Sequence, residues 1–132
     1  MMNNNRIPTQ RVSAIPVYDS KGSAEAFYVH PHIYNRNGDW IGWVTQQKEV
    51  YSVLGCYVGI LTDEPRILRT RVNESPKPNK KPPAPPPRLP VPATVPLAPM
   101  MREITYSTVD VLLEEPELLH TFDSGEQRQD LD

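Results

Sequence analysis

The chain has 132 residues and a formal charge of −2, and its length suits one domain with appendages. This charge argues against a nucleic-acid or anionic-membrane partner, because such partners usually require a strong basic excess. The single cysteine, Cys56, excludes an intrachain disulfide and fits a reducing compartment. The polar start, MMNNNRIPTQ, is not a signal peptide, and no apolar run reaches the ~20 residues of a membrane span. We therefore expect a cytoplasmic protein.

Proline divides the chain. It supplies 16 residues, and eleven of them lie between Pro76 and Pro99. Such a window cannot form a helix or a sheet, because proline lacks the backbone N–H and fixes φ. We predict a disordered N-terminus (1–10), a domain of repeated β-hairpins (11–75), a proline-rich linker (76–100) and an acidic tail with a short helix (101–132).

An internal repeat dominates the first part of the chain. Residues 17–28, 33–44 and 50–61 align without a gap. Each segment starts with a β-branched residue and a tyrosine, has glycine four residues after the tyrosine, and has a small residue four positions later. These repeated positions are Tyr18, Gly22 and Ala26; Tyr34, Gly38 and Gly42; and Tyr51, Gly55 and Gly59.

One repeat predicts one β-hairpin. The β-branched residue and the tyrosine favour a strand, and the glycine supplies a positive φ in the turn. A small residue within a strand indicates close approach of backbones or simply allows strand twist. Residues 66–72 resemble half of a fourth unit, and we predict that residues 11–15 pair with them and close a ring, which would remove the exposed sheet edges.

Strict alternation would place Trp40, Gly42 and Val44 on one face of their strand and Ile41 and Trp43 on the other. Both faces are then largely apolar in the second and third units. Such hairpins must be covered on both faces, or must line a cavity. We name Trp40, Trp43 and Tyr57 as candidate residues of an apolar pocket for a lipid tail or another apolar small molecule.

The repeating pattern, with its β-branched residue and tyrosine, a turn that ends in glycine and then aromatic, aliphatic and small residues, resembles the four-fold β-flower family of bacterial, often cyanobacterial, proteins. The best unit is residues 33–44, IYNRNGDWIGWV. The resemblance implies an all-β, pseudo-symmetric ring or shallow barrel of hairpins with a short apolar channel. It implies no established activity and no catalytic residues. MORN repeats and YD repeats have a similar hairpin pattern and are the alternatives.

No motif indicates catalysis, because the chain lacks nucleophile-elbow, phosphate-loop, dinucleotide-binding and zinc-protease signatures. We predict that the protein is not an enzyme and binds neither a cofactor nor a metal. Residues 76–99 should form a polyproline II spacer, although the basic run around residues 80–88 also contains PxxP, a form that SH3-like grooves bind.

The acidic tail carries an apolar set: Val109, Leu112, Leu113, Leu118, Leu119 and Phe122. A short helix starting near Ser107 would place some of these residues on one face. They either dock on a protein partner at the end of the spacer or pack on the parent domain. The sequence favours a non-enzymatic protein-interaction or scaffold module, and the alternative is a domain that binds an apolar ligand at the ring axis.

Overall fold

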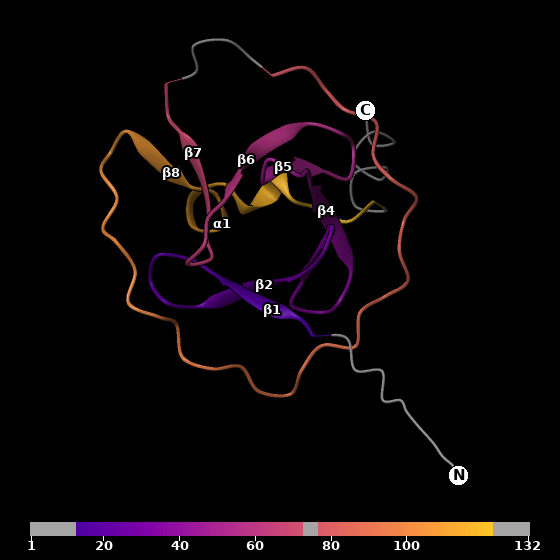
Figure 1. Cartoon of the computed structure of the whole chain (residues 1–132), viewed down its shortest axis with the longest axis horizontal. Helices are drawn as coiled ribbons and strands as arrows, with labels where there is room; N and C mark the ends of the chain where they lie inside the picture. The colour runs from indigo at the N-terminus through magenta and orange to yellow at the C-terminus, as the bar shows by residue number, and fades with distance from the viewer. Residues whose placement is uncertain (1–12, 73–76, 123–132) are drawn as a thin grey trace.

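A computed structural model describes residues 13–72 and 77–122. Its strands form one antiparallel sheet in which each strand pairs with the next along the chain. The strands are β1 (Ile15–Tyr18), β2 (Ala24–Val29), β3 (His32–Asn35), β4 (Trp40–Val44), β5 (Glu49–Ser52), β6 (Tyr57–Leu61), β7 (Ile67–Thr70) and β8 (Thr108–Asp110). The sheet curls into a half-barrel (Figure 1), and the predicted all-β fold of repeated hairpins is confirmed. The predicted disordered N-terminus, residues 1–10, lies outside the described residues.

Each of the first three units is a hairpin with the same register. In the first, Val17 lies opposite Ala26 and Tyr18 lies opposite Ala24. The second strand of the hairpin therefore carries one additional residue, a β-bulge. The other two hairpins repeat this shift, and the additional residues are Glu25, Ile41 and Val58.

The bulge overturns the strict alternation expected for these strands. Ile41, which was expected to share a face with Trp43, packs with Val44 in the central core, and Trp40 packs in a second cluster to which Trp43 is attached. One additional residue moves every side chain before it to the other face of the strand.

The small residues of the repeat lie where neighbouring strands come close. A Cβ atom on Gly42 would lie 2.7 Å from the carbonyl oxygen of Tyr51, and one on Gly59 would lie 2.7 Å from that of Leu68. These distances are too short for any side chain. The glycines therefore serve the close approach of successive units, beyond allowing twist.

The fourth unit is completed from the other end of the chain. β7 pairs with β8, and Arg69 lies opposite Val109. The prediction that residues 11–15 pair with β7 is wrong: Ile15 lies in β1 opposite Tyr28. β1 and β8 are the two edges of the sheet, and the N–H of Ser20, in the turn after β1, donates a hydrogen bond of 2.6 Å to Asp110 Oδ2 at the end of β8.

The tail folds onto its own domain. After β8 follow a short helix α1 (Val111–Glu114) and a 3-10 turn (Pro116–Leu118). Helix thus begins later than Ser107, because residues 108–110 pair with β7 as a strand. Val109, Leu112 and Leu119 are buried in the central core, so these three are not exposed for a partner, whereas Leu113 and Phe122 are exposed and Leu118 is half-buried.

The proline-rich segment encircles the domain instead of extending away from it. Figure 1 shows the chain leaving β7, passing around the sheet and returning to β8. We call its described part, residues 77–100, the belt. Because β8 pairs with β7 and side chains of α1 enter the core, the tail is part of the domain and not a separate unit at the end of a spacer.

Replacing Val109 by alanine tests whether the tail belongs to the core. Val109 is fully buried, so Val109→Ala should lower the free energy of unfolding by about 1.5–3 kcal/mol in urea titrations. The matched control is Leu113→Ala, a neighbouring exposed side chain that should change stability by less than about 0.5 kcal/mol. Equal, small effects of both changes would contradict the packing of β8.

Candidate functional site

The hairpin turns are built alike at three places. In the first, the Asp19 carboxylate accepts hydrogen bonds from the N–H groups of Lys21 and Ser23, and Gly22 follows with φ +90°. Asn35 and Ser52 take the same role in the next two turns. A side-chain oxygen that bonds the turn backbone, followed by glycine at positive φ, fixes one loop geometry. Three similar turns therefore project from the sheet.

The belt meets these turns at regular intervals. The N–H of Lys80 donates to the Gly55 carbonyl and the N–H of Leu89 to the Gly38 carbonyl, both at 2.9 Å. Ala98 lies against Gly22, where an added Cβ would be 3.7 Å from its side chain. Positions 80, 89 and 98 are nine residues apart, which is about 28 Å of polyproline II. We call the three turn–belt contacts the stations.

The glycines of two stations leave no room for a side chain. A Cβ on Gly38 would lie 2.1 Å from the Leu89 carbonyl oxygen, and one on Gly55 would lie 2.3 Å from that of Lys80. Backbone therefore meets backbone at both turns. Recognition at these stations therefore includes a contact of the peptide group that does not depend on the belt side chain.

The repeat tyrosines complete the stations. All three are buried in the sheet, with exposed fractions of 5% or less. The Tyr18 hydroxyl donates to the Pro96 carbonyl at 2.8 Å, Tyr34 packs with Leu89, and the Tyr51 ring lies 5.9 Å from the Lys80 ammonium. The tyrosine and the glycine of each repeat thus face the belt together.

Leu89 is the main apolar anchor of the belt. It is 7% exposed, whereas its neighbours Arg88 and Pro90 are exposed. Its partners come from three hairpins: Phe27, Tyr34, Trp40 and Val53. Beside it, the Arg88 guanidinium donates to the Asn37 carbonyl at 2.7 and 3.0 Å. The second station therefore combines backbone, apolar and charged contacts.

Ion pairs fasten the belt and the tail. Lys77 lies 3.1 Å from Glu49, and this hydrogen bond holds the pKa of the Glu49 carboxyl below its ordinary value. Arg69 donates to Glu115 at 2.7 Å and lowers the pKa of that carboxyl in the same way. Basic side chains of β7 thus pair with the acidic tail, and Arg71 adds a contact to Glu114.

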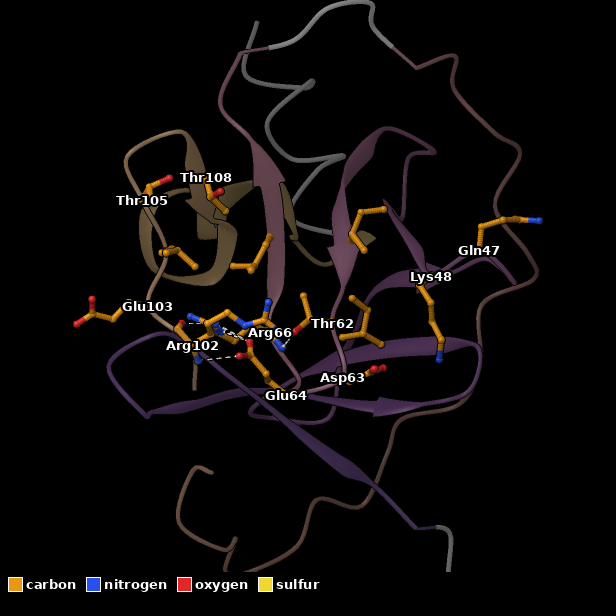
Figure 2. A pocket seen from close by; sticks show the side chains of 14 residues that line it. Gln47, Lys48, Thr62, Asp63, Glu64, Arg66, Arg102, Glu103, Thr105 and Thr108 are labelled. Atoms are coloured by element: carbon orange, nitrogen blue, oxygen red, sulfur yellow. Dashed lines mark hydrogen bonds and ion pairs between the residues drawn. The ribbon is translucent and has the colours of Figure 1, made fainter. Parts of the chain in front are cut away.

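A groove of about 630 Å³ lies beside β6 and β7 and is walled on its other side by the chain that returns to β8 (Figure 2). Its apolar lining comes from Ile60, Leu61, Leu68 and Ile104. Figure 2 shows Lys48 at one end and a bonded group of Glu64, Arg66 and Arg102 at the other. Glu64 and Arg66 hold the returning chain at Arg102 through hydrogen bonds to its backbone.

Arg66 joins three segments. It is 2% exposed, and its guanidinium donates to Glu64 Oε1 at 2.7 Å, to the Ser20 hydroxyl at 2.9 Å and to the Arg102 carbonyl at 2.7 Å. Burial by itself would raise the pKa of Glu64, but the Arg102 N–H and Arg66 outweigh it and the pKa is lowered. The first turn, the β6–β7 loop and the returning chain are held at one point.

The sequence-predicted pocket residues do not come together around one cavity. Trp40 lines a small cavity of about 260 Å³ with Asp39, Pro85, Thr121 and Phe122. Trp43 stacks on Tyr51 with ring centroids 5.1 Å apart, and Tyr57 meets the same ring edge-on. Neither Trp43 nor Tyr57 lines this cavity or the groove.

Within residues 13–72 and 77–122, no group of three or more histidine, cysteine or acidic side chains could hold a metal ion. In the same residues no helix is long and apolar enough to cross a bilayer. His32 lies between the rings of Tyr34 and Trp40, where burial, and secondly the charge of His30, lowers its pKa. Its surroundings are those of a packed histidine.

The sheet thus consists of three hairpins with the same register and similar turns, followed by β7 as half of a fourth unit. Residues 15–69 match the family model of the 4-fold beta flower protein. The resemblance inferred from the repeats is thereby confirmed over β1 to β7. No match was found among curated proteins or solved structures. The belt, β8 and α1 lie outside the β-flower region that the family model covers.

Sequence reasoning missed the stations. The β-flower repeat was identified, but the partner of its tyrosines and glycines was not. The sequence carries no specific signal for the stations, because every non-proline residue of the run has an N–H and nothing distinguishes Lys80 and Leu89 from their neighbours. Proline at either position would remove the donor.

Two glycine substitutions separate turn strain from loss of the belt. Gly38→Ala and Gly22→Ala both place a side chain at positive φ, which costs about 1–2 kcal/mol. Only Gly38→Ala also displaces the Leu89 carbonyl. The free energy of unfolding of this variant should therefore fall by a further ~2 kcal/mol. Trypsin should also cleave the variant faster after Arg88. Equal unfolding free energies and equal cleavage rates would refute the second station.

Acid should loosen the belt and the tail. The pKa values of Glu49, Glu64 and Glu115 are lowered in the folded chain, so the stability they contribute is present above the unfolded value of about 4.3 and is lost as the pH falls through the folded values. The urea midpoint should therefore decline below about pH 4. The double variant Glu49→Gln/Glu115→Gln should show a smaller decline, and an unchanged pH profile would count against these ion pairs.

Proposed function

We propose that this chain is a non-enzymatic protein-interaction module. In this proposal the β-flower region is a scaffold, and the belt is a preformed polyproline ligand that it presents to a partner. The interaction surface is thus moved from the tail, where Val109, Leu112 and Leu119 are buried in the core, to the outer side of the belt.

The observation that carries the proposal is the exposure pattern of the belt. Pro83 and Pro86 are half-buried and Leu89 is buried, whereas residues 84, 85, 87 and 88 are exposed. Over residues 83–89 this is the period of three of a polyproline II helix, so in that stretch one edge faces the hairpins and two edges face outward.

The outward edges carry a PxxP pair. Pro87 and Pro90 are both exposed, and the exposed Lys81 lies on the same edge six residues before Pro87. Domains that bind polyproline II use an aromatic-lined groove for two such prolines, and Lys81 would suit acidic side chains beside that groove. The partner we propose is a groove of this chemistry.

Anchoring favours binding. A free proline-rich segment loses conformational freedom when it binds, and a ligand that is already ordered loses less. The stations hold the belt at three places while leaving Pro87 and Pro90 exposed. The alternative ligand site at the ring axis has less support, because Leu112 and Leu119 fill the central core.

A panel of purified SH3 and WW domains tests the proposal. The full-length chain is titrated against each domain by calorimetry, and at least one domain with an acidic groove should bind. In that complex Pro87→Ala/Pro90→Ala should weaken binding at least about tenfold, or ~1.4 kcal/mol, because both outward prolines are removed.

The matched control is Pro92→Ala, which alters an exposed belt proline outside the PxxP pair. It should leave the dissociation constant unchanged, and both variants should keep the thermal unfolding midpoint of the parent chain. If no domain of the panel binds, or if Pro92→Ala weakens binding as much as the double variant, the proposal fails.

A further inference from the structure

The groove beside β6 and β7 has an apolar floor that stays partly exposed. Ile60 and Leu68 lie opposite each other in the register of the two strands, and both are only half-buried. Ile104 of the returning chain, also half-buried, adds to the same lining. These three side chains belong to neither core cluster. A groove of about 630 Å³ with such a floor has the size and polarity of a site for a small, largely apolar molecule.

Lys48, which lies at one end of the groove, takes a place that glycine takes in the other turns. Its N–H donates to the Thr45 carbonyl, as the N–H of Gly22 donates to the Asp19 carbonyl, both at 3.0 Å. Its φ of +69° is the one positive value at a non-glycine residue in the described part of the chain. A side chain is disfavoured in this conformation, whereas glycine adopts it without strain. The turn would form more readily with glycine, so the lysine side chain points to a role other than folding.

The Lys48 ammonium is free to bind a ligand. Within residues 13–72 and 77–122 it forms no ion pair, although six other basic side chains do. Asp63 also lines the groove, but it is exposed and does not pair with Lys48. The charge at this end is therefore neutralised by solvent alone.

The other end of the groove is also not acidic. There the guanidinium groups of Arg66 and Arg102 both act on the one carboxylate of Glu64. Figure 2 shows the Glu103 carboxylate directed away from this group. With Lys48 and Asp63 included, three positive and two negative side chains remain along the groove, an excess of one positive charge. This excess suits a ligand that carries a single negative charge.

We propose that the groove binds an unbranched aliphatic carboxylate, of the chemistry of a free medium-chain fatty acid. The carboxylate pairs with the Lys48 ammonium, and the hydrocarbon chain covers Ile60, Leu68 and Ile104. Covering these side chains removes apolar surface from water, which drives the binding. The site lies outside both core clusters, so it differs from a ligand site at the ring axis. It does not depend on the polyproline partner.

The first experiment titrates the full-length chain with decanoate. Calorimetry measures the affinity, and NMR of ¹³C-labelled isoleucine and leucine methyl groups locates the ligand. We expect saturable binding with the largest shifts at Ile60, Leu68 and Ile104, and each methylene added from octanoate to decanoate should tighten binding by up to about fourfold. Absence of binding at millimolar decanoate, or largest shifts at leucines of the central core, would overturn the proposal.

Lys48→Gly separates binding from folding. The variant loses the ammonium and relieves the turn, so its thermal unfolding midpoint should not fall. Decanoate should bind at least about tenfold more weakly, because a charged hydrogen-bond partner is removed. Uncharged octanol should bind the parent and the variant alike. The matched control Lys21→Gly removes a lysine of the first turn, outside the groove lining, and should leave the decanoate affinity unchanged.

Two further measurements fix the sign of the charge. Asp63→Asn removes the opposing carboxylate and should tighten decanoate binding by about threefold. Lys48→Gln, which keeps a side chain at the turn, should weaken binding as Lys48→Gly does and replaces that variant if it fails to fold. Octylamine that binds more tightly than octanoate, or a charge-removing variant of Lys48 with the parent affinity, would show that the groove is not an anion site and would refute the proposal.

Discussion

The pairing of β7 with β8 is the constraint on which the rest of the structure depends. Three β-flower hairpins and β7 leave one strand position empty, and the chain fills it only after passing around the whole sheet. Val109 and Val111 then close the core from the side that the hairpins leave open. Arg66 secures the entry to β8, because a buried guanidinium with three bonded segments is costly to release.

The repeat signature therefore has two physical roles. Within a hairpin, glycine permits the turn and tyrosine favours the strand. Toward the belt, the same residues supply a carbonyl acceptor, a hydroxyl donor or an aromatic surface, as Gly38, Tyr18 and Tyr51 do. A scaffold that is repeated by internal symmetry binds a segment with a matching repeat, and this is how a proline-rich sequence becomes ordered without a helix or a sheet.

The hairpins could be predicted from sequence because their signals are local. The tyrosine, the turn and Gly38 lie within a few residues, and the confirmed β-flower match rests on that short pattern. The bulge at Ile41 could not be predicted, because the apolar pattern of this strand does not show where one additional residue is inserted. The pairing of β7 with residues near Val109 could not be read either, because both strands are short and far apart in the chain. Leu89 could not be distinguished from other apolar residues of a linker, because the residues that bury it lie far away in the chain.

The nine-residue station spacing acts as a molecular ruler. Polyproline II turns by one third per residue, so lengthening the belt by one residue rotates everything beyond that point by 120°. Leu89 would then point away from its pocket, or the strand register at β8 would have to absorb the slip. Insertions in multiples of three keep the phase but add slack. In this chain the length of a segment without regular secondary structure is therefore as tightly constrained as the sequence of its hairpins.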